Sequence, residues 1–71
     1  MTVMDQTWKR TARRNVRKLS PAGAQATIAR INAEGTTIFH ADIRALTGGY
    51  KSRSINFHVI RLLAKRAGVI K

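Results

Sequence analysis

Glycines divide the chain after residue 20 into three short helical patterns, and this division constrains the fold more than any other feature. Gly35, the pair Gly48-Gly49 and Gly68 each follow apolar residues at helical spacing. Glycine readily adopts the left-handed conformation that ends a helix. The sequence therefore predicts helices over residues 21 to 34, 41 to 47 and 55 to 67.

The first of these helices has a clear start, and all three have an apolar side. Ser20 can cap free backbone N–H groups, and Pro21 suits the first position of a helix. The apolar positions are Ala24, Ile28, Ile31, Ile43, Leu46, Ile55, Val59, Leu62 and Leu63. A small core suits a chain of 71 residues, because such a chain buries only about 60% of its unfolded surface. We expect a mainly α, three-helix helix-turn-helix domain at residues 20 to 71.

Two short segments favour extended structure instead. Residues 36 to 39 are β-branched or aromatic, and Val69-Ile70 follow the last glycine. We expect a brief strand at each place, with Val69-Ile70 paired to Thr37-Ile38 if the chain closes that way.

The basic charge is concentrated at the two ends of the sequence. The chain has 14 Lys+Arg and 3 Asp+Glu, which gives a formal net charge of +11 at pH 7. Residues 1 to 19 and 48 to 71 are strongly basic, whereas residues 20 to 47 have as many acids as bases. Acid-poor blocks concentrate positive potential where it can engage phosphates, so we expect nucleic acid as the partner. The alternative for the first block is a basic tail that is merely solvated.

The first block, residues 1 to 19, is predicted to be a disordered basic tail that becomes helical on binding. From Trp8 to Leu19 the sizeable apolar residues are Trp8, Val16 and Leu19, too few to bury a face, although lysine and arginine tolerate a helix. Its cations are candidates for contacts with phosphates: Lys9, Arg10, Arg13, Arg14, Arg17 and Lys18.

The last predicted helix carries the best candidate surface for nucleic acid. Polar residues recur on one side of it at helical spacing, and they continue into the residues just before it. The candidates are Lys51, Ser52, Arg53, Ser54, His58, Arg61, Lys65 and Lys71. The alternative is an ordinary solvated face, but such a face normally mixes acids with bases, and no acid occurs from Gly48 onward. A nucleic-acid interface is therefore favoured.

A second strip on this helix is apolar and consists of Phe57, Ile60 and Ala64. Cover by the chain itself is one explanation for it. The other is contact with a partner, because aromatic and aliphatic side chains left in a patch usually mark an interface. Phe57 and Ile60 are thus candidates for a protein interface, including that of a homodimer.

Three stretches between Ile38 and Ile70 share the pattern of a known family. They are Asp42-Ile43-Arg44-Ala45-Leu46-Thr47-Gly48, Ser52-Arg53-Ser54-Ile55 and Leu62-Leu63-Ala64-Lys65-Arg66-Ala67-Gly68-Val69-Ile70. With these stretches the chain resembles the core of winged helix-turn-helix proteins, MarR- and ArsR-type regulators among them. The resemblance implies a DNA-binding domain whose last helix enters the major groove. The family's two-stranded wing would start at Lys71, so we expect the wing to be missing or minimal.

Two functions from different classes remain open at this point. The leading one is a small basic transcription regulator that binds the major groove of duplex DNA, with DNA favoured over RNA and Arg53 contacting guanine. The alternative is an accessory protein, phage-encoded for example, that docks on RNA polymerase and modulates transcription by inhibition or antitermination. An RNA- or ribosome-binding winged-helix protein is a variant of this alternative, and the arginine-rich first block weakly resembles phage-type transcription modulators.

The sequence offers little for catalysis or for a cofactor. It has no cysteine, its acids Asp5, Glu34 and Asp42 are far apart, and no phosphate-binding or nucleophile motif occurs. For His40 and Asp42, helix capping or simple exposure to solvent is a far better explanation than a metal site. We expect no enzyme activity, no cofactor and no metal. No apolar run approaches the roughly 20 residues of a membrane span, so we expect a cytoplasmic protein without membrane contact.

Overall fold

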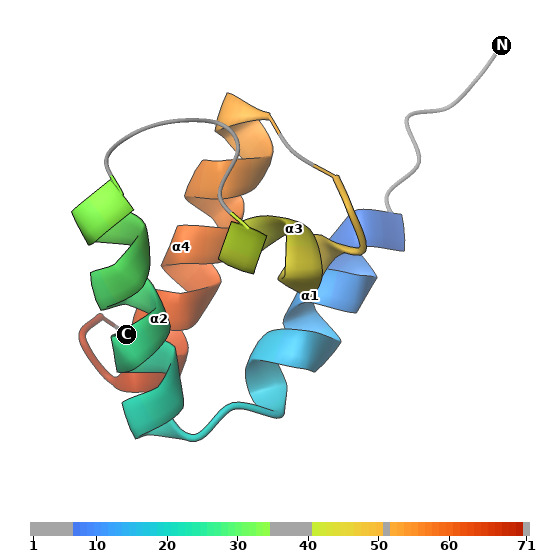
Figure 1. Cartoon of the computed structure of the whole chain (residues 1–71). Helices are drawn as coiled ribbons and strands as arrows, with labels where there is room; N and C mark the ends of the chain where they lie inside the picture. Colours follow the sequence, from blue (N-terminus) through green and yellow to red (C-terminus); the bar gives the residue numbers. More distant parts are fainter. Residues whose placement is uncertain (1–6, 35–40, 51, 71) are drawn as a thin grey trace, which may run out of the picture.

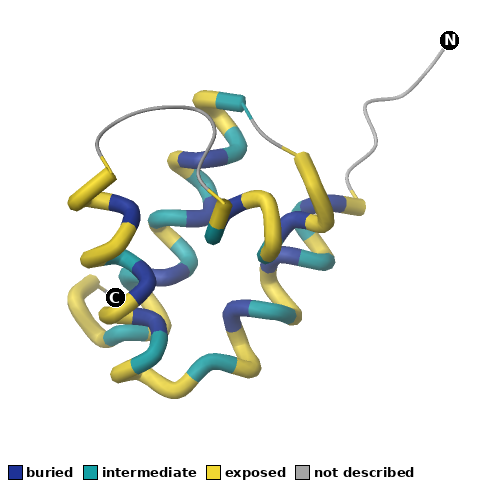
Figure 2. The backbone as a smooth tube through the Cα atoms, in the orientation of Figure 1, coloured by how far each residue is buried: buried dark blue, intermediate teal, exposed yellow. Residues whose placement is uncertain are grey.

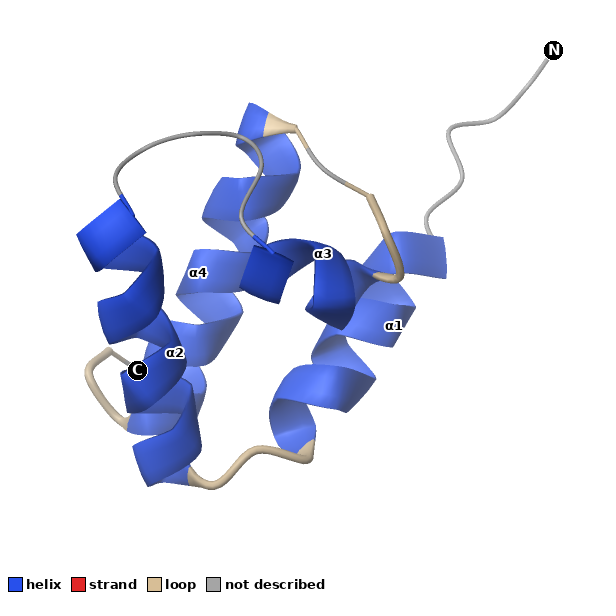
Figure 3. Cartoon of the chain, in the orientation of Figure 1, coloured by secondary structure: helices blue, strands red, loops and turns tan. Residues whose placement is uncertain are grey.

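Four helices make up the part of the chain that the computed structural model describes, residues 7–34, 41–50 and 52–70 (Figure 1). They are α1 (Thr7–Arg17), α2 (Pro21–Glu34), α3 (Ala41–Thr47) and α4 (Arg53–Ala67). These residues contain no strand (Figure 3). Helices α2 and α4 pack side by side in opposite directions, and α1 packs against both α3 and α4. The expectation of a mainly helical protein is confirmed.

Helix α2 has the predicted bounds because its start is capped as expected. The Ser20 hydroxyl oxygen accepts the backbone N–H of Gly23 at 2.9 Å, and the Ser20 carbonyl accepts that of Ala24 at 2.9 Å. Ala24 and Ile31 are buried, and Ile28 packs at the edge of the core. The predicted apolar stripe is therefore the side that faces the core.

Thr47 connects the end of α3 to the turn that follows. Its buried hydroxyl lies 2.9 Å from the carbonyl oxygen of Ile43 and 2.7 Å from that of Tyr50. Gly48 and Gly49 have φ values of 83° and 108°, which side chains with a Cβ rarely adopt. The helix therefore ends at Thr47, as predicted, and the chain turns abruptly toward α4.

Helix α4 begins at Arg53, earlier than the predicted start at Ile55, because Ser52 is its N-cap. The Ser52 hydroxyl accepts the backbone N–H of Ile55 at 3.1 Å, and its carbonyl accepts that of Asn56 at 2.8 Å. Gly68, with φ 81°, ends the helix as predicted.

The strand predicted at Val69-Ile70 is not formed. The backbone N–H of Val69 donates to the Ala64 carbonyl at 2.9 Å, and that of Gly68 donates to the Lys65 carbonyl at 3.2 Å. This is how a helix closes on a left-handed glycine, and it uses a donor that strand pairing would need. The predicted partner segment, residues 36 to 39, lies outside the described residues, as does Gly35.

The largest correction concerns the basic block at residues 1 to 19, for which the sequence predicts a tail that folds only on binding. Within it, residues 7 to 17 form α1, and Trp8, Ala12 and Val16 are buried at intervals of four residues. One large ring and one alanine that permits close approach are enough to bury this side of the helix. Helix α1 is therefore part of the folded protein, and residues 1–6 lie outside the described residues.

A single core joins the four helices (Figure 2). Its buried members are Ala12, Val16, Ala24, Ile31, Ile43, Val59 and Leu63. Two polar contacts fix α3 against its neighbours. The Asn15 side-chain amide donates to the Leu46 carbonyl at 2.8 Å, and Arg30 donates twice to the Asp42 carboxylate at 3.2 Å.

Candidate nucleic-acid interface

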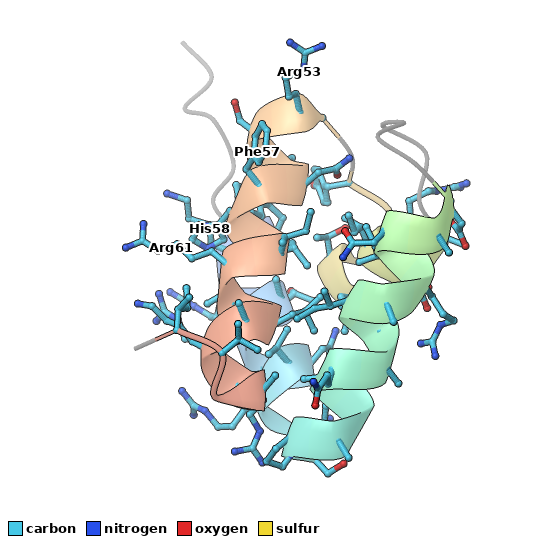
Figure 4. All side chains as sticks on the ribbon, turned by 90° about the vertical axis from the view of Figure 1, so that its left-hand side faces the viewer. Arg53, Phe57, His58 and Arg61 are labelled. Carbon is cyan, nitrogen blue, oxygen red and sulfur yellow. The ribbon has the colours of Figure 1, made fainter. Side chains whose placement is uncertain are left out.

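A strip of exposed side chains runs along α4 and includes most of the stripe predicted there. We call Arg53, Ser54, Phe57, Arg61 and Lys65 the α4 strip, and all five are exposed. Figure 4 shows Arg53 at the N-terminal tip of the helix, with Phe57 and Arg61 extending from its outer side. The predicted contacts Lys51 and Lys71 lie outside the described residues.

The N-terminal end of α4 adds to the positive potential of this strip. The first turn contains no acid, and the helix dipole is equivalent to roughly half a positive charge at this end. Arg53 therefore lies where free backbone N–H groups also favour an anion. Ser52, predicted to contact nucleic acid, uses its hydroxyl oxygen to cap the helix, so its role in the fold is structural.

His58 does not belong to the outer strip, although its spacing predicted that it would. Its ring packs edge-on against Trp8 of α1, with ring centres 5.2 Å apart and an angle of 86° between the ring planes. Partial burial lowers the pKa of His58 below its ordinary value of 6.5, and the charges of Lys9, Arg13 and Arg61 lower it further. The imidazole is thus a neutral contact between α1 and α4 at pH 7.

The apolar strip predicted on α4 is divided in the structure. Ile60 packs against the core and Ala64 is half-buried, whereas 66% of Phe57 is exposed. Of the two residues predicted as a protein interface, Phe57 is therefore exposed, whereas Ile60 is half-buried against the core. This aromatic ring lies within the α4 strip, between the arginines of positions 53 and 61 (Figure 4).

The cations predicted on the N-terminal block fall on two sides of α1. Lys9 lies toward α4, because its ammonium is 5.8 Å from the centre of the Trp8 ring, which packs on His58. Arg13 follows by one turn on the same side of α1, and both charges lower the pKa of His58. Arg10 and Arg14 are exposed and lie one residue further around the helix. The remaining cations, Arg17 and Lys18, are exposed at and just after its end.

Two further arginines bind within the protein. Arg30 of α2 pairs with Asp42 of α3, and hydrogen bonding to this carboxylate raises the pKa of Arg30. Arg66, near the end of α4, donates to the Leu19 carbonyl at 2.6 Å and joins that end to the segment after α1. Neither arginine was predicted as a site residue, and their contacts are intramolecular.

The comparisons with known proteins give no relative for this chain. No protein-family model, no curated protein and no solved structure matches it. Among the described residues, no helix has the length and apolar character to cross a membrane, and no three potential metal ligands form a group.

The functional feature that sequence reasoning missed is the joining of α1 to α4. The pattern that could have revealed it is Trp8, Ala12 and Val16, spaced by four residues on one side of a helix. Lys9 and Arg13, which the sequence predicts to belong to a tail, lie on this docked helix.

Proposed function

We propose that this protein is a small transcription regulator that binds duplex DNA, with α3 and α4 as a helix-turn-helix and α4 in the major groove. The observation that carries the proposal is the α4 strip, which exposes two arginines, a lysine and a serine on one side of a helix without acids. The resemblance to winged helix-turn-helix proteins supports the same assignment. Helix α4 has 15 residues and so is about 22 Å long, enough to cross a groove about 12 Å wide.

The chemistry of the strip assigns a role to each side chain. Arg53, at the exposed tip, has the bidentate donor geometry that recognises guanine, and Ser54 can contact a base edge or a phosphate. Phe57 supplies an apolar surface of the kind that contacts a thymine methyl group. Arg61 and Lys65, further along the helix, bind phosphates and give affinity without reading the sequence.

Phe57 also supports a second candidate function. A large aromatic side chain that is 66% exposed is typical of a contact with another protein, such as RNA polymerase or a second copy of this chain. In that function the protein is an accessory factor, and its cations bind nearby nucleic acid. Changing Phe57→Ala would then weaken the protein complex more than changing the strip arginines.

The experiment measures binding of a short, fluorescently labelled DNA duplex of mixed sequence by anisotropy at several salt concentrations. The variant R53A/R61A should bind about 30-fold more weakly or worse, because a bidentate contact of Arg53 with a base contributes about 1–3 kcal/mol and loss of Arg61 removes a phosphate contact as well. The control R10A/R14A removes the same charge from the outer side of α1 and should lose much less. If about seven phosphates are neutralised, the slope of log K against log salt is near −6.

The proposal has a defined point of failure. A salt slope shallower than about −2 contradicts duplex binding through this strip. Equal losses in R53A/R61A and R10A/R14A contradict a specific role for α4. A labelled RNA hairpin in the same assay tests the RNA alternative, which requires tighter binding to RNA than to the duplex.

A further inference from the structure

The packing of α1 on α4 creates a second feature beside the α4 strip. Trp8 and His58 are in edge-to-face contact across the two helices, and we call the surface around this ring pair the α1–α4 seam. Trp8 is almost fully buried, so the seam is a fixed part of the fold. The side chains around it therefore keep their places relative to α4.

Cations from both helices lie around the seam. The Lys9 ammonium is 5.8 Å from the centre of the Trp8 ring, Arg13 follows Lys9 by one turn on the same side of α1, and Arg61 extends from the same side of α4 as His58 (Figure 4). The charges of these three residues lower the pKa of His58. Neither α1 nor α4 contains an aspartate or a glutamate. Neighbouring charges of the same sign repel one another, and salt screens this repulsion fully only beyond the Debye length of about 8 Å at physiological salt. Folding thus brings charges of the same sign together, and the repulsion between them is reduced when an anion binds between them.

We propose that the seam binds a backbone phosphate of nucleic acid, held by Lys9 and Arg13 of α1 together with Arg61 of α4. The inference rests on the proposed function and extends its surface from one helix to two. Arg61 belongs to both the α4 strip and the seam, so a strand that follows α4 passes directly onto α1. Helix α1 then fixes the position of α4 on the duplex, since phosphate contacts set the register and orientation of a bound protein.

The cations on the outer side of α1 do not take part in the proposed phosphate site. Arg10 and Arg14 are separated by four residues, as are Lys9 and Arg13, but they point away from His58. They contribute to the long-range potential that attracts DNA and do not hold a phosphate at the seam. The chain therefore offers two cation pairs with equal spacing and equal charge on different sides of α1.

The test compares K9Q/R13Q with R10Q/R14Q in duplex binding by the full chain. K9Q/R13Q should bind about tenfold more weakly at moderate salt, and the salt slope should become shallower by about 0.9, the value for one phosphate that is no longer neutralised. R10Q/R14Q should lose less than about threefold, because its charges act at a distance. Thermal melting of both variants should stay close to that of the wild type, because none of the four cations is buried.

A second readout distinguishes a phosphate at the seam from a general effect of charge. Addition of duplex should raise the pKa of His58 in the wild-type protein, measured from its imidazole NMR signals, because a nearby anion favours the charged imidazole. In K9Q/R13Q this rise should be largely lost, whereas R10Q/R14Q should retain it.

Each outcome decides between the proposals. Equal losses for the two pairs, or an unchanged pKa of His58 on binding, overturn the seam. The α4 strip is then the whole interface, provided that R53A/R61A still weakens binding about 30-fold or more. No duplex binding by the wild-type protein overturns the proposed function and the seam together.

Discussion

Helices α1 and α4 are both basic and contain no acid, yet they depend on the fold in different ways. Helix α4 buries Val59 and Leu63, and half-buried Ile55, Ile60 and Leu62 widen its apolar side. The buried side of α1 is a single line of three residues, and the rest of the helix is mostly cationic. A helix of 11 residues is marginal in isolation, so α1 is helical because it docks.

The difference shows that a dense block of charge does not by itself identify a tail. A narrow apolar line is enough to fix a basic helix when it contains one aromatic ring and one residue small enough for close packing. The consequence for function is that the cations of α1 have fixed positions. The basic surface of α4 can therefore continue onto α1, whereas the cations of a tail would have no fixed position relative to α4.

The substitution Trp8→Ala tests this comparison with the largest expected effect. Trp8 is 7% exposed, and removal of a buried tryptophan costs about 3–5 kcal/mol. For a domain of this size, a loss of about 3 kcal/mol lowers the melting temperature by about 12 °C or more. Circular dichroism on heating measures the effect. The variant also lacks the ring contact with His58, and it should bind duplex DNA more weakly because α1 is no longer held against α4.

Phe57→Ala is the matched control, because it removes another aromatic ring, one that is 66% exposed on α4. Its melting temperature should stay close to that of the wild type, since exposed substitutions change stability by about 0.5 kcal/mol or less. An unchanged melting temperature in Trp8→Ala would contradict the docking of α1.

A smaller effect on the melting temperature is expected from pH, and it tests the contact between α1 and α4 at His58. Burial and the charges of Lys9, Arg13 and Arg61 lower the pKa of His58, so the unfolded chain binds this proton more readily than the folded one. The contribution of neutral His58 is complete above the unfolded value near 6.5 and decreases as the pH falls below it. The melting temperature should therefore fall between about pH 7 and pH 5.

The variant His58→Gln isolates this effect from the other titrating groups. Its melting temperature should depend less on pH over the same range, because glutamine does not titrate. An identical pH dependence in the two proteins would show that His58 has no perturbed pKa in the fold.

Much of the fold follows from local chemistry that is visible in the sequence. The bounds of α2 and α3 were predicted correctly because Ser20, Pro21 and the Gly48-Gly49 pair mark helix ends through backbone requirements that need no tertiary information. Docking of α1 was not predicted, because its apolar line of Trp8, Ala12 and Val16 is narrow and the partners that bury it lie far along the chain. The strand at Val69-Ile70 was wrong because closure of α4 on Gly68 determines the backbone bonds there.

The candidate site was predicted only in part, for a related reason. Helical spacing placed Arg61 and Lys65 correctly on the exposed side of α4. The same spacing placed His58 among them, because a periodicity shows which side of a helix a residue is on but does not show what packs there. Trp8 covers that edge of α4, and this contact converts a predicted groove residue into part of the seam.

The most direct test of a DNA-binding surface shared by α1 and α4 is an NMR map of the ¹⁵N-labelled wild-type protein titrated with duplex DNA. The proposal predicts that the largest shift changes lie along the α4 strip and at Lys9 and Arg13, with small changes on the outer side of α2. Changes confined to α4 would contradict the shared surface. Changes on α2, or none at all, would contradict DNA binding by this face of the protein.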